Sequence, residues 1–390
     1  MGGKMHIHQD REIIGVTLGV LNEDASAAVD LLLNAFSRDV NLSEDRILAE
    51  KEILHRRNLE VQRDQLEQTY SSLFETTFRD HSMGLPILGI RDNAANLTAE
   101  QLNDFRDTTF VGSNVALSVS GNLTNATEIL SKASEGLKKW PAESQKVENK
   151  ISEMNLEKPL MTSSVMAIRD DEMANLNIAV SYNAPAYGSE DAIFHRFYER
   201  MIGNYNANDN GIAHLNVANR QYNSAHSMLG NFPGINLFRT EYMGYSDHGI
   251  FTNFIHGNEV WGDISLYLGQ HFNLEYTKGV NQAEVFRARA RCFVDLMEAS
   301  RASIPNNLSI GRDLLYMGRR MSRSELAQRY SALADPTHIL KKSKVHFYDQ
   351  DIAVVAYGPQ HMIDNSNYFD RSMRKSTLHS LMIKIKLLAQ

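Results

Sequence analysis

Two distant segments of the chain share one sequence pattern. Residues 110–121 read FVGSNVALSVSG, and residues 347–358 read FYDQDIAVVAYG. Both fit F-x-x-x-[N/D]-[V/I]-A-[L/V]-x-[V/A]-x-G. A β-rich run closed by a glycine is typical of a buried strand that ends in a turn. The sequence therefore predicts a strand in each segment.

Two further features precede each segment in the same order. One is a helix-capping pattern, S/T-x-x-E/Q, in the stretches LTAEQLNDF and MSRSELAQRY. The capping residues are Thr98 with Gln101 and Ser322 with Glu325. The other is a Met-Gly step, at residues 83–84 and 317–318. Because these features recur in one order, the chain is predicted to consist of two homologous α+β halves.

The stretch KKWPAESQKVENKISEMNLEKPL is polar, contains two prolines and lacks apolar periodicity, as a linker does. We therefore expect a first domain at 1–145, a linker at 146–160 and a second domain at 161–390 with a basic tail. The second half spans roughly 200 residues up to Gly358. Gly121 has only 120 residues before it. The first domain is thus expected to lack roughly 75 to 80 residues at its start.

Composition excludes several classes of protein. A net charge of −7 argues against a broad nucleic-acid surface. The single cysteine, Cys292, rules out an internal disulfide and favours a reducing compartment, and we expect its thiol to be packed in a core. No apolar run approaches the roughly 20 residues that a membrane-spanning helix needs. The chain is therefore expected not to be transmembrane.

Neither H-E-x-x-H nor H-x-x-E-H occurs among the fourteen histidines and their neighbours. The stretch HGNEV places His256 before Glu259 but has a valine where the second histidine would stand. His195 and Glu199 form an i, i+4 pair on a predicted helix, where a packed or solvated face is the simpler interpretation. These patterns give no zinc-binding helix.

The first strand-like stretch, MGGKMHIHQDRE, places His6 and His8 two residues apart, so both point to one face of a strand. Zinc sites usually need three or four ligands, and no further ligand lies near them in sequence. We expect a polar strand face. The basic stretches RARAR and GRRMSRSE are expected to be solvated helix faces, with partner contact as the alternative. The tail RSMRKSTLHSLMIKIKLLAQ could lie on a partner or membrane surface, or close a helix.

Several stretches resemble one family of proteins. They are MGGKMHIHQDRE, SMGLPILGIRDN, GIAHLNVANRQYNSAHSM, SIGRDLLYMGRRMSRSE and FYDQDIAVVAYGP. The chain is similar to the mitochondrial processing peptidase β subunits and the core proteins 1 of respiratory complex III, within the pitrilysin-type metallopeptidases. The resemblance implies two homologous α+β domains, each an antiparallel-rich sheet with helices packed on one face, the first domain being incomplete. It also implies that His6 and His8 are ordinary strand residues.

The resemblance places one zinc ligand of the family, a glutamate, within RILAEKEILHRRNLEVQRDQLEQ. An ungapped match puts Arg57 at this ligand position and Glu50 at a carboxylate that active members keep near the metal. An arginine has no lone pair to donate and remains charged. Glu52 and Glu60 are close in sequence but lie on the wrong helix face unless the register slips. We therefore expect no metal site, no catalytic residue and no cofactor-binding residue in this chain.

The function implied by the resemblance is that of a non-catalytic core subunit of mitochondrial complex III, the ubiquinol–cytochrome c reductase. The expected location is the matrix side of the mitochondrial inner membrane. The expected partners are a second, processing-peptidase-α-like core protein, cytochrome b, cytochrome c1 and the Rieske protein, and not nucleic acid. The alternative is an active processing peptidase β subunit that cleaves presequences with zinc. An α-type substrate-binding subunit ranks last, because no flexible glycine-rich loop is recognisable.

Overall fold

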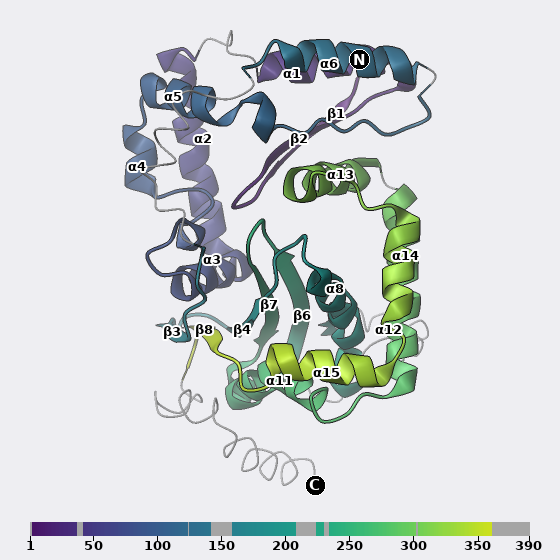
Figure 1. The fold of residues 1–390 in the computed structure, drawn as a ribbon. Helices are drawn as coiled ribbons and strands as arrows, with labels where there is room; N and C mark the ends of the chain where they lie inside the picture. Colours follow the sequence, from purple (N-terminus) through teal and green to yellow (C-terminus); the bar gives the residue numbers. More distant parts are fainter. Residues whose placement is uncertain are drawn as a thin grey trace. The chain divides into compact units, whose positions relative to one another are not determined.

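The computed structural model describes most of the chain. The described residues are 2–36, 42–123, 125–141, 158–207, 224–229, 234–301 and 303–360. They form two compact units (Figure 1). Unit 1 consists of Met1–Glu60, Pro86–Lys158 and Leu296–Ser322, and unit 2 of Val61–Leu85, Pro159–Asp295 and Arg323–Gln390. These units are defined by contacts, whereas the predicted domains are stretches of sequence, so the limits 1–145, 146–160 and 161–390 stay a prediction.

Unit 2 is built around a six-stranded sheet in the order β3-β8-β4-β7-β6-β5. Every neighbouring pair is antiparallel except β3 and β8, which run parallel. The strands are β3 (Ser164–Arg169), β4 (Leu176–Ala184), β5 (Tyr205–Asn206), β6 (Ile235–Gly244), β7 (Gly249–Gly257) and β8 (Ile352–Gly358). The predicted antiparallel-rich sheet is confirmed here.

Helices cover both faces of this sheet, as the apolar residues on both faces of β4 require. On one face Val180 lies against Gly269 of α11, and Tyr182 meets Phe347 of α15 at a ring distance of 5.4 Å. The helices of unit 2 are α3 (Gln65–Thr77), α8 (Glu190–Ile202), α10 (Ser224–Leu229), α11 (Gly262–Glu275), α14 (Arg323–Ala332), α15 (Pro336–Phe347) and α12 (Gln282–Arg301), of which the part from Leu296 on is counted with unit 1. The turns η2 (Ser82–Gly84) and η5 (Glu259–Trp261) are short 3₁₀ helices.

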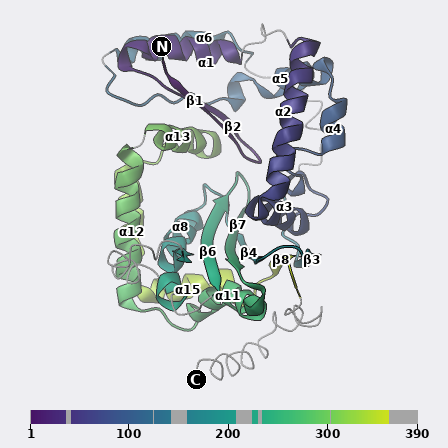
Figure 2. The same ribbon diagram turned by 180° about the vertical axis from the view of Figure 1, so that it is seen from behind.

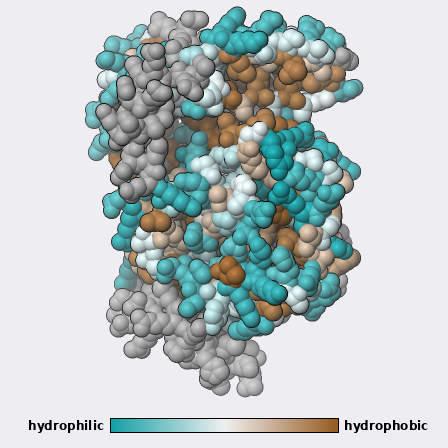
Figure 3. Space-filling model, in the orientation of Figure 1, coloured by the Kyte–Doolittle hydropathy of each residue, from teal (hydrophilic) through white to brown (hydrophobic). Residues whose placement is uncertain are grey.

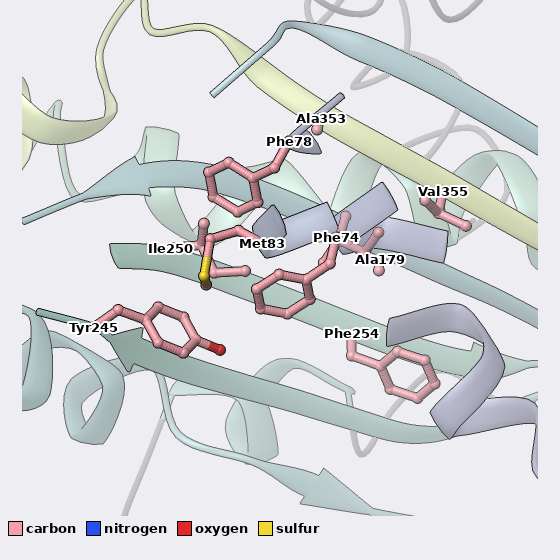
Figure 4. Close-up of a cluster of buried hydrophobic side chains, with 10 residues drawn as sticks. Phe74, Phe78, Met83, Ala179, Tyr245, Ile250, Phe254, Ala353 and Val355 are labelled. Atoms are coloured by element: carbon pink, nitrogen blue, oxygen red, sulfur yellow. The ribbon is translucent and has the colours of Figure 1, made fainter. Parts of the chain in front are cut away.

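The opposite face of the sheet is covered by α3, which comes from the first third of the chain. Leu73 and Phe74 are buried in a cluster with sheet residues (Figure 4). The buried cluster consists of Leu73, Phe74, Phe78, Met83, Ala179, Tyr245, Ile250, Phe254, Ala353 and Val355. Thr76 donates from Oγ1 to Oγ of Ser164 at 3.1 Å, so α3 is also fixed to β3 by a buried hydrogen bond. The resemblance implied helices on one face of the sheet, whereas in unit 2 helices cover both faces.

Unit 1 contains a two-stranded antiparallel hairpin, β1 (Lys4–Gln9) and β2 (Ile14–Gly19). One face of β2 packs on α13, where a side chain at Gly15 would meet Leu308. The opposite face carries Met5 and Ile7, which are both exposed. Figure 3 shows apolar surface, in brown, among the hydrophilic surface of the molecule. The helices of unit 1 are α1 (Ala25–Ala35), α2 (Glu44–Arg63), α4 (Arg91–Asn96), α5 (Ala99–Thr109), α6 (Ala126–Lys138) and α13 (Ser303–Met317), with 3₁₀ turns η1 (Asn22–Asp24) and η3 (Gly112–Asn114).

The order of elements repeats along the chain. The series β1, β2, η1, α1, α2, α3 recurs as β6, β7, η5, α11, α12, α13. α2 and α12 have 20 residues each, and the Met-Gly steps follow α3 and end α13. The packing is reciprocal, since α3 covers the sheet of unit 2 and α13 covers the hairpin of unit 1. The predicted repeat is therefore visible in the secondary structure.

One predicted strand is confirmed and the other is wrong. Residues 352–358 form β8, but residues 112–114 form η3 and residues 115–120 form no strand. The reason is that a strand needs a neighbour for its backbone hydrogen bonds. β8 lies between β3 and β4. Residues 115–120 are paired with none of the strands that the structure describes.

The predicted capping patterns mark real helix starts. The Thr98 hydroxyl oxygen accepts a hydrogen bond from the Gln101 backbone N–H, and Oε1 of Gln101 accepts one from the Thr98 backbone N–H, which together form a capping box at α5. α14 begins directly after Ser322. However, the helix directly before β8 is α15, capped by Asp335, so α15 and not α14 takes the place that α5 has in the first half. The tail at 371–390 and most of the linker at 146–160 lie outside the described residues. None of the described helices is long and apolar enough to cross a membrane.

Candidate functional site

The ligand position implied by the resemblance lies on α2, a helix with no buried side chain. Acidic Glu44 and Asp45 in its first turn and Arg63 in its last turn match the charges that a helix dipole favours. Asp64 then ends α2 and caps α3, because its carboxylate accepts from the N–H of Leu66 at 2.9 Å. Asp64 therefore divides this stretch into two helices, α2 and α3.

Arg57 and Glu50 are both exposed on α2. They are seven residues apart, which at 3.6 residues per turn places them within about 20° of each other around the helix. Glu50 could supply one oxygen ligand to a metal, but the guanidinium beside it has no lone pair and carries a fixed positive charge. This face of α2 therefore does not fit a zinc ion.

The other two glutamates of α2 do not replace the missing ligand. Glu52 is five residues from Arg57 and points about 140° away from it, and Glu60, three residues on, points about 60° away. Both are exposed. A carboxylate at the angle of Arg57 would need an insertion or deletion within α2, and the helix runs unbroken from Glu44 to Arg63.

His6 and His8 lie on one face of β1, opposite Thr17 and Gly15 of β2. Nε2 of His8 lies 3.6 Å from Oδ2 of Asp10. Neither histidine belongs to a group of three or more potential metal ligands within the described residues. His6 is exposed and His8 is half-buried, and that neither of them binds a metal stays a prediction.

His256 and Glu259 do not share a helix. His256 lies on β7, where its Nδ1 is 2.8 Å from Oδ1 of Asn177, and Glu259 begins η5. Zinc-binding motifs of this type need both residues on one helical face. The partial match in HGNEV is therefore a coincidence of sequence.

His195 of α8 is fully buried in an aromatic core. Its Nδ1 donates to the backbone oxygen of Asp191 at 2.9 Å, and its ring lies 4.5 Å from that of His346. Burial lowers the pKa of His195 to about 3. His346 lowers this pKa further, and Asp191 acts to raise it. The imidazole is neutral at physiological pH and acts as a packed core residue.

Glu199, at the other end of that i, i+4 pair, belongs to an ion network between α8 and α12. Nη1 of Arg200 donates to Oε1 of Glu199 at 2.6 Å, and Nε of Arg200 donates to Asp295. Arg291 donates from Nε to the same carboxylate at 2.8 Å. Burial lowers the pKa of Arg200, but the two carboxylates outweigh it, and the pKa lies above its usual value. Burial raises the pKa of Glu199.

Cys292 lies on the inner face of α12 and is 3% exposed. Burial raises the pKa of its thiol to about 12, with the nearby Arg200 in opposition. A thiol that stays protonated is not a nucleophile. The predicted core role of Cys292 is confirmed.

Sequence reasoning missed the network of Arg200 and Asp295. The signal that could have found it is the equal length of α2 and α12. Counted from Glu44 and Gln282, Arg57 and Asp295 are each the fourteenth residue of a 20-residue helix. The position that carries a cation in unit 1 thus carries an anion, paired with Arg200, in unit 2.

Comparisons with known proteins give one matching family and several relatives. Residues 96–250 match the family described as Peptidase M16 inactive domain. The mitochondrial-processing peptidase subunit β of Neurospora crassa is 25% identical over 362 residues, covering 92% of this chain and 73% of that protein. The probable β subunit of Arabidopsis thaliana is 24% identical over 372 residues, covering 95% of this chain and 68% of that protein.

Solved structures share the fold. A chain of complex III from Candida albicans aligns with a TM-score of 0.80 at 18% identity, covering 95% of this chain and 86% of that one. The peptidase M16 inactive domain from Pseudomonas fluorescens aligns with a TM-score of 0.74 at 15% identity, covering 92% and 81%. The matched family, the β-subunit relatives and the shared fold all make this chain similar to the M16 peptidases.

Proposed function

We propose that this protein is a non-catalytic core subunit of mitochondrial respiratory complex III. It would lie on the matrix side of the inner membrane, paired with a second, processing-peptidase-α-like core protein. Cytochrome b, cytochrome c1 and the Rieske protein would be its other neighbours. The observation that carries the proposal is the exposed Arg57 on α2, at the position where the resemblance requires a ligating glutamate.

The electrostatics of this position support a structural role. A guanidinium about 4 Å from a divalent cation repels it by on the order of several kcal/mol at an effective dielectric near 20. Arg57 therefore opposes metal binding in addition to removing a ligand. Hydrolysis by a zinc centre would require a carboxylate in its place, which α2 does not offer at that angle.

The relatives and neighbours support the mitochondrial setting. The curated relatives are named mitochondrial-processing peptidase subunits β, and a chain of Candida albicans complex III shares the fold over 95% of this chain. A core subunit needs surfaces for neighbours and no reaction centre. Exposed apolar residues on the β1–β2 hairpin and on α12 are consistent with such contacts.

The second candidate is a processing peptidase β subunit. The names of the relatives favour it, since they match along nearly the whole chain. Against it stand Arg57 and the absence of H-E-x-x-H and H-x-x-E-H from these 390 residues. This candidate requires the missing ligands to come from residues outside this sequence.

Isolation of the endogenous protein separates the two candidates. A tag on the chain would be used to purify its complex in mild detergent, followed by a native gel with haem staining and metal analysis. Comigration with b- and c-type haem, without zinc in stoichiometric amount on this subunit, supports the core subunit. A soluble two-subunit fraction that contains zinc and cleaves a presequence peptide would overturn it.

A further inference from the structure

One face of α12 is apolar and open, although α12 belongs to a packed unit. Its inner face is buried through Val285, Ala288 and Cys292. Its outer face carries Phe286, which is 59% exposed, and Val294, which is 45% exposed. Figure 2 shows α12 as one long helix. The outer face thus presents side chains that a solvated helix surface rarely carries.

The spacing of these side chains is that of a helix-binding seam. Phe286, Ala290 and Phe293 follow the spacing i, i+4, i+7, with Val294 beside them; Ala290 is exposed and Phe293 is half-buried. Apolar residues at these intervals are the anchors by which one helix packs along another. We call this set, with Arg287 and Arg289, the α12 seam.

The flanks of the α12 seam are basic. In a heptad that places Phe286 and Phe293 at d and Ala290 at a, Arg287 falls at e and Arg289 at g. The Arg289 guanidinium lies over the Phe286 ring, 5.5 Å from its centroid. Arg291, farther from the seam, is already held by Asp295. Residues at e and g set which partner helix pairs with a seam, because they meet the flanking charges of that helix.

We propose that the α12 seam binds an amphipathic helix of a partner protein whose apolar stripe is flanked by acidic residues. Phe286 and Phe293 bury the stripe, and Arg287 and Arg289 pair with carboxylates on either side of it. A basic amphipathic helix, such as a mitochondrial targeting segment, would meet like charges on both flanks. The proposal concerns a binding surface and holds for either function considered above.

The test uses the full chain and two synthetic helical peptides. Both carry leucine at a and d; one has glutamate at every e and g position and the other has lysine, so that neither pairs with itself. We expect the acidic peptide to bind roughly tenfold more tightly than the basic one in fluorescence anisotropy. The Arg287→Glu/Arg289→Glu variant should reverse the preference, and Phe286→Ser should weaken binding of the acidic peptide.

Leu48 provides the matched control. It is the fifth residue of α2, as Phe286 is of α12, and it is 65% exposed. Leu48→Ser should leave binding of the acidic peptide unchanged, and thermal unfolding should show that all variants are folded. Failure of the acidic peptide to bind, a preference that survives the charge reversal, or self-association of the chain that Phe286→Ser abolishes would each overturn the proposal.

Discussion

Arg57 and Asp295 occupy the same position in two helices of equal length and carry opposite charges. Asp295 in unit 2 is half-buried and neutralised by Arg200 and Arg291. Arg57 in unit 1 is exposed on α2. The two halves therefore share the helix but differ in the charge at this position. Neither Arg57 nor Asp295 has a set of metal ligands among the described residues around it.

Restoring a glutamate at the ligand position should not create an enzyme. We expect Arg57→Glu to show no cleavage of a presequence peptide, because this chain contains no zinc-binding histidine motif. Cleavage would be followed by mass spectrometry with added zinc. Arg56→Glu, an exposed neighbour on α2, is the matched control. Cleavage by the Arg57 variant alone would contradict the non-catalytic interpretation.

The Arg200–Asp295 pair should contribute to stability. Asp295→Asn leaves Arg200 with one carboxylate fewer in a partly buried site. We expect the free energy of unfolding to fall by about 1–3 kcal/mol in urea titrations. Asp171→Asn breaks an exposed pair with Arg169 and should lower the free energy of unfolding clearly less, because water and salt screen an exposed pair. Equal losses in both variants would show that the network between α8 and α12 contributes no more to stability than an exposed ion pair does.

Acid should destabilise the protein through His195. Its pKa is about 3 when folded and about 6.5 when unfolded, so the unfolded state binds one more proton between these values. The contribution of His195 to the free energy of unfolding is therefore fully present above pH 6.5, and it falls by about 1.4 kcal/mol per pH unit on acidification towards pH 3. His195→Asn can still donate to Asp191, and its unfolding free energy should fall less steeply with acid. An unchanged slope would refute this assignment.

The thiol of Cys292 should be inert in the folded protein. With a pKa of about 12, only about one thiol in ten thousand is ionised at pH 8. Iodoacetamide should label Cys292 within minutes in urea and hardly at all in buffer, as measured by mass spectrometry. Rapid labelling under native conditions, in protein shown to be folded by circular dichroism, would contradict the buried position.

The packing of α3 on the sheet of unit 2 should be a major source of stability. Phe74→Ala removes a buried ring from the cluster with Phe254 and Val355, and we expect a loss of about 3–5 kcal/mol. Leu48→Ala, on the exposed surface of α2, should change the unfolding free energy by less than about 0.5 kcal/mol. Comparable effects would show that α3 is not part of the unit 2 core.

The sequence by itself determined the features that depend on near neighbours. The capping box at Thr98, the Met-Gly steps and the strand at Ile352–Gly358 can all be read from local patterns, whereas the ligand position at Arg57 is implied only by the resemblance to a known family. Local patterns suffice for these elements because helix starts and buried strands are set by residue types within a few positions.

Only the tertiary structure decided which surfaces meet. Residues 115–120 have the pattern of β8 but pair with none of the described strands, and α3 covers a sheet whose strands begin about 90 residues later in the chain. The ion pair of Arg200 with Asp295 also joins helices far apart in sequence. These outcomes depend on hydrogen-bond partners and burial supplied by distant segments, which no local pattern encodes.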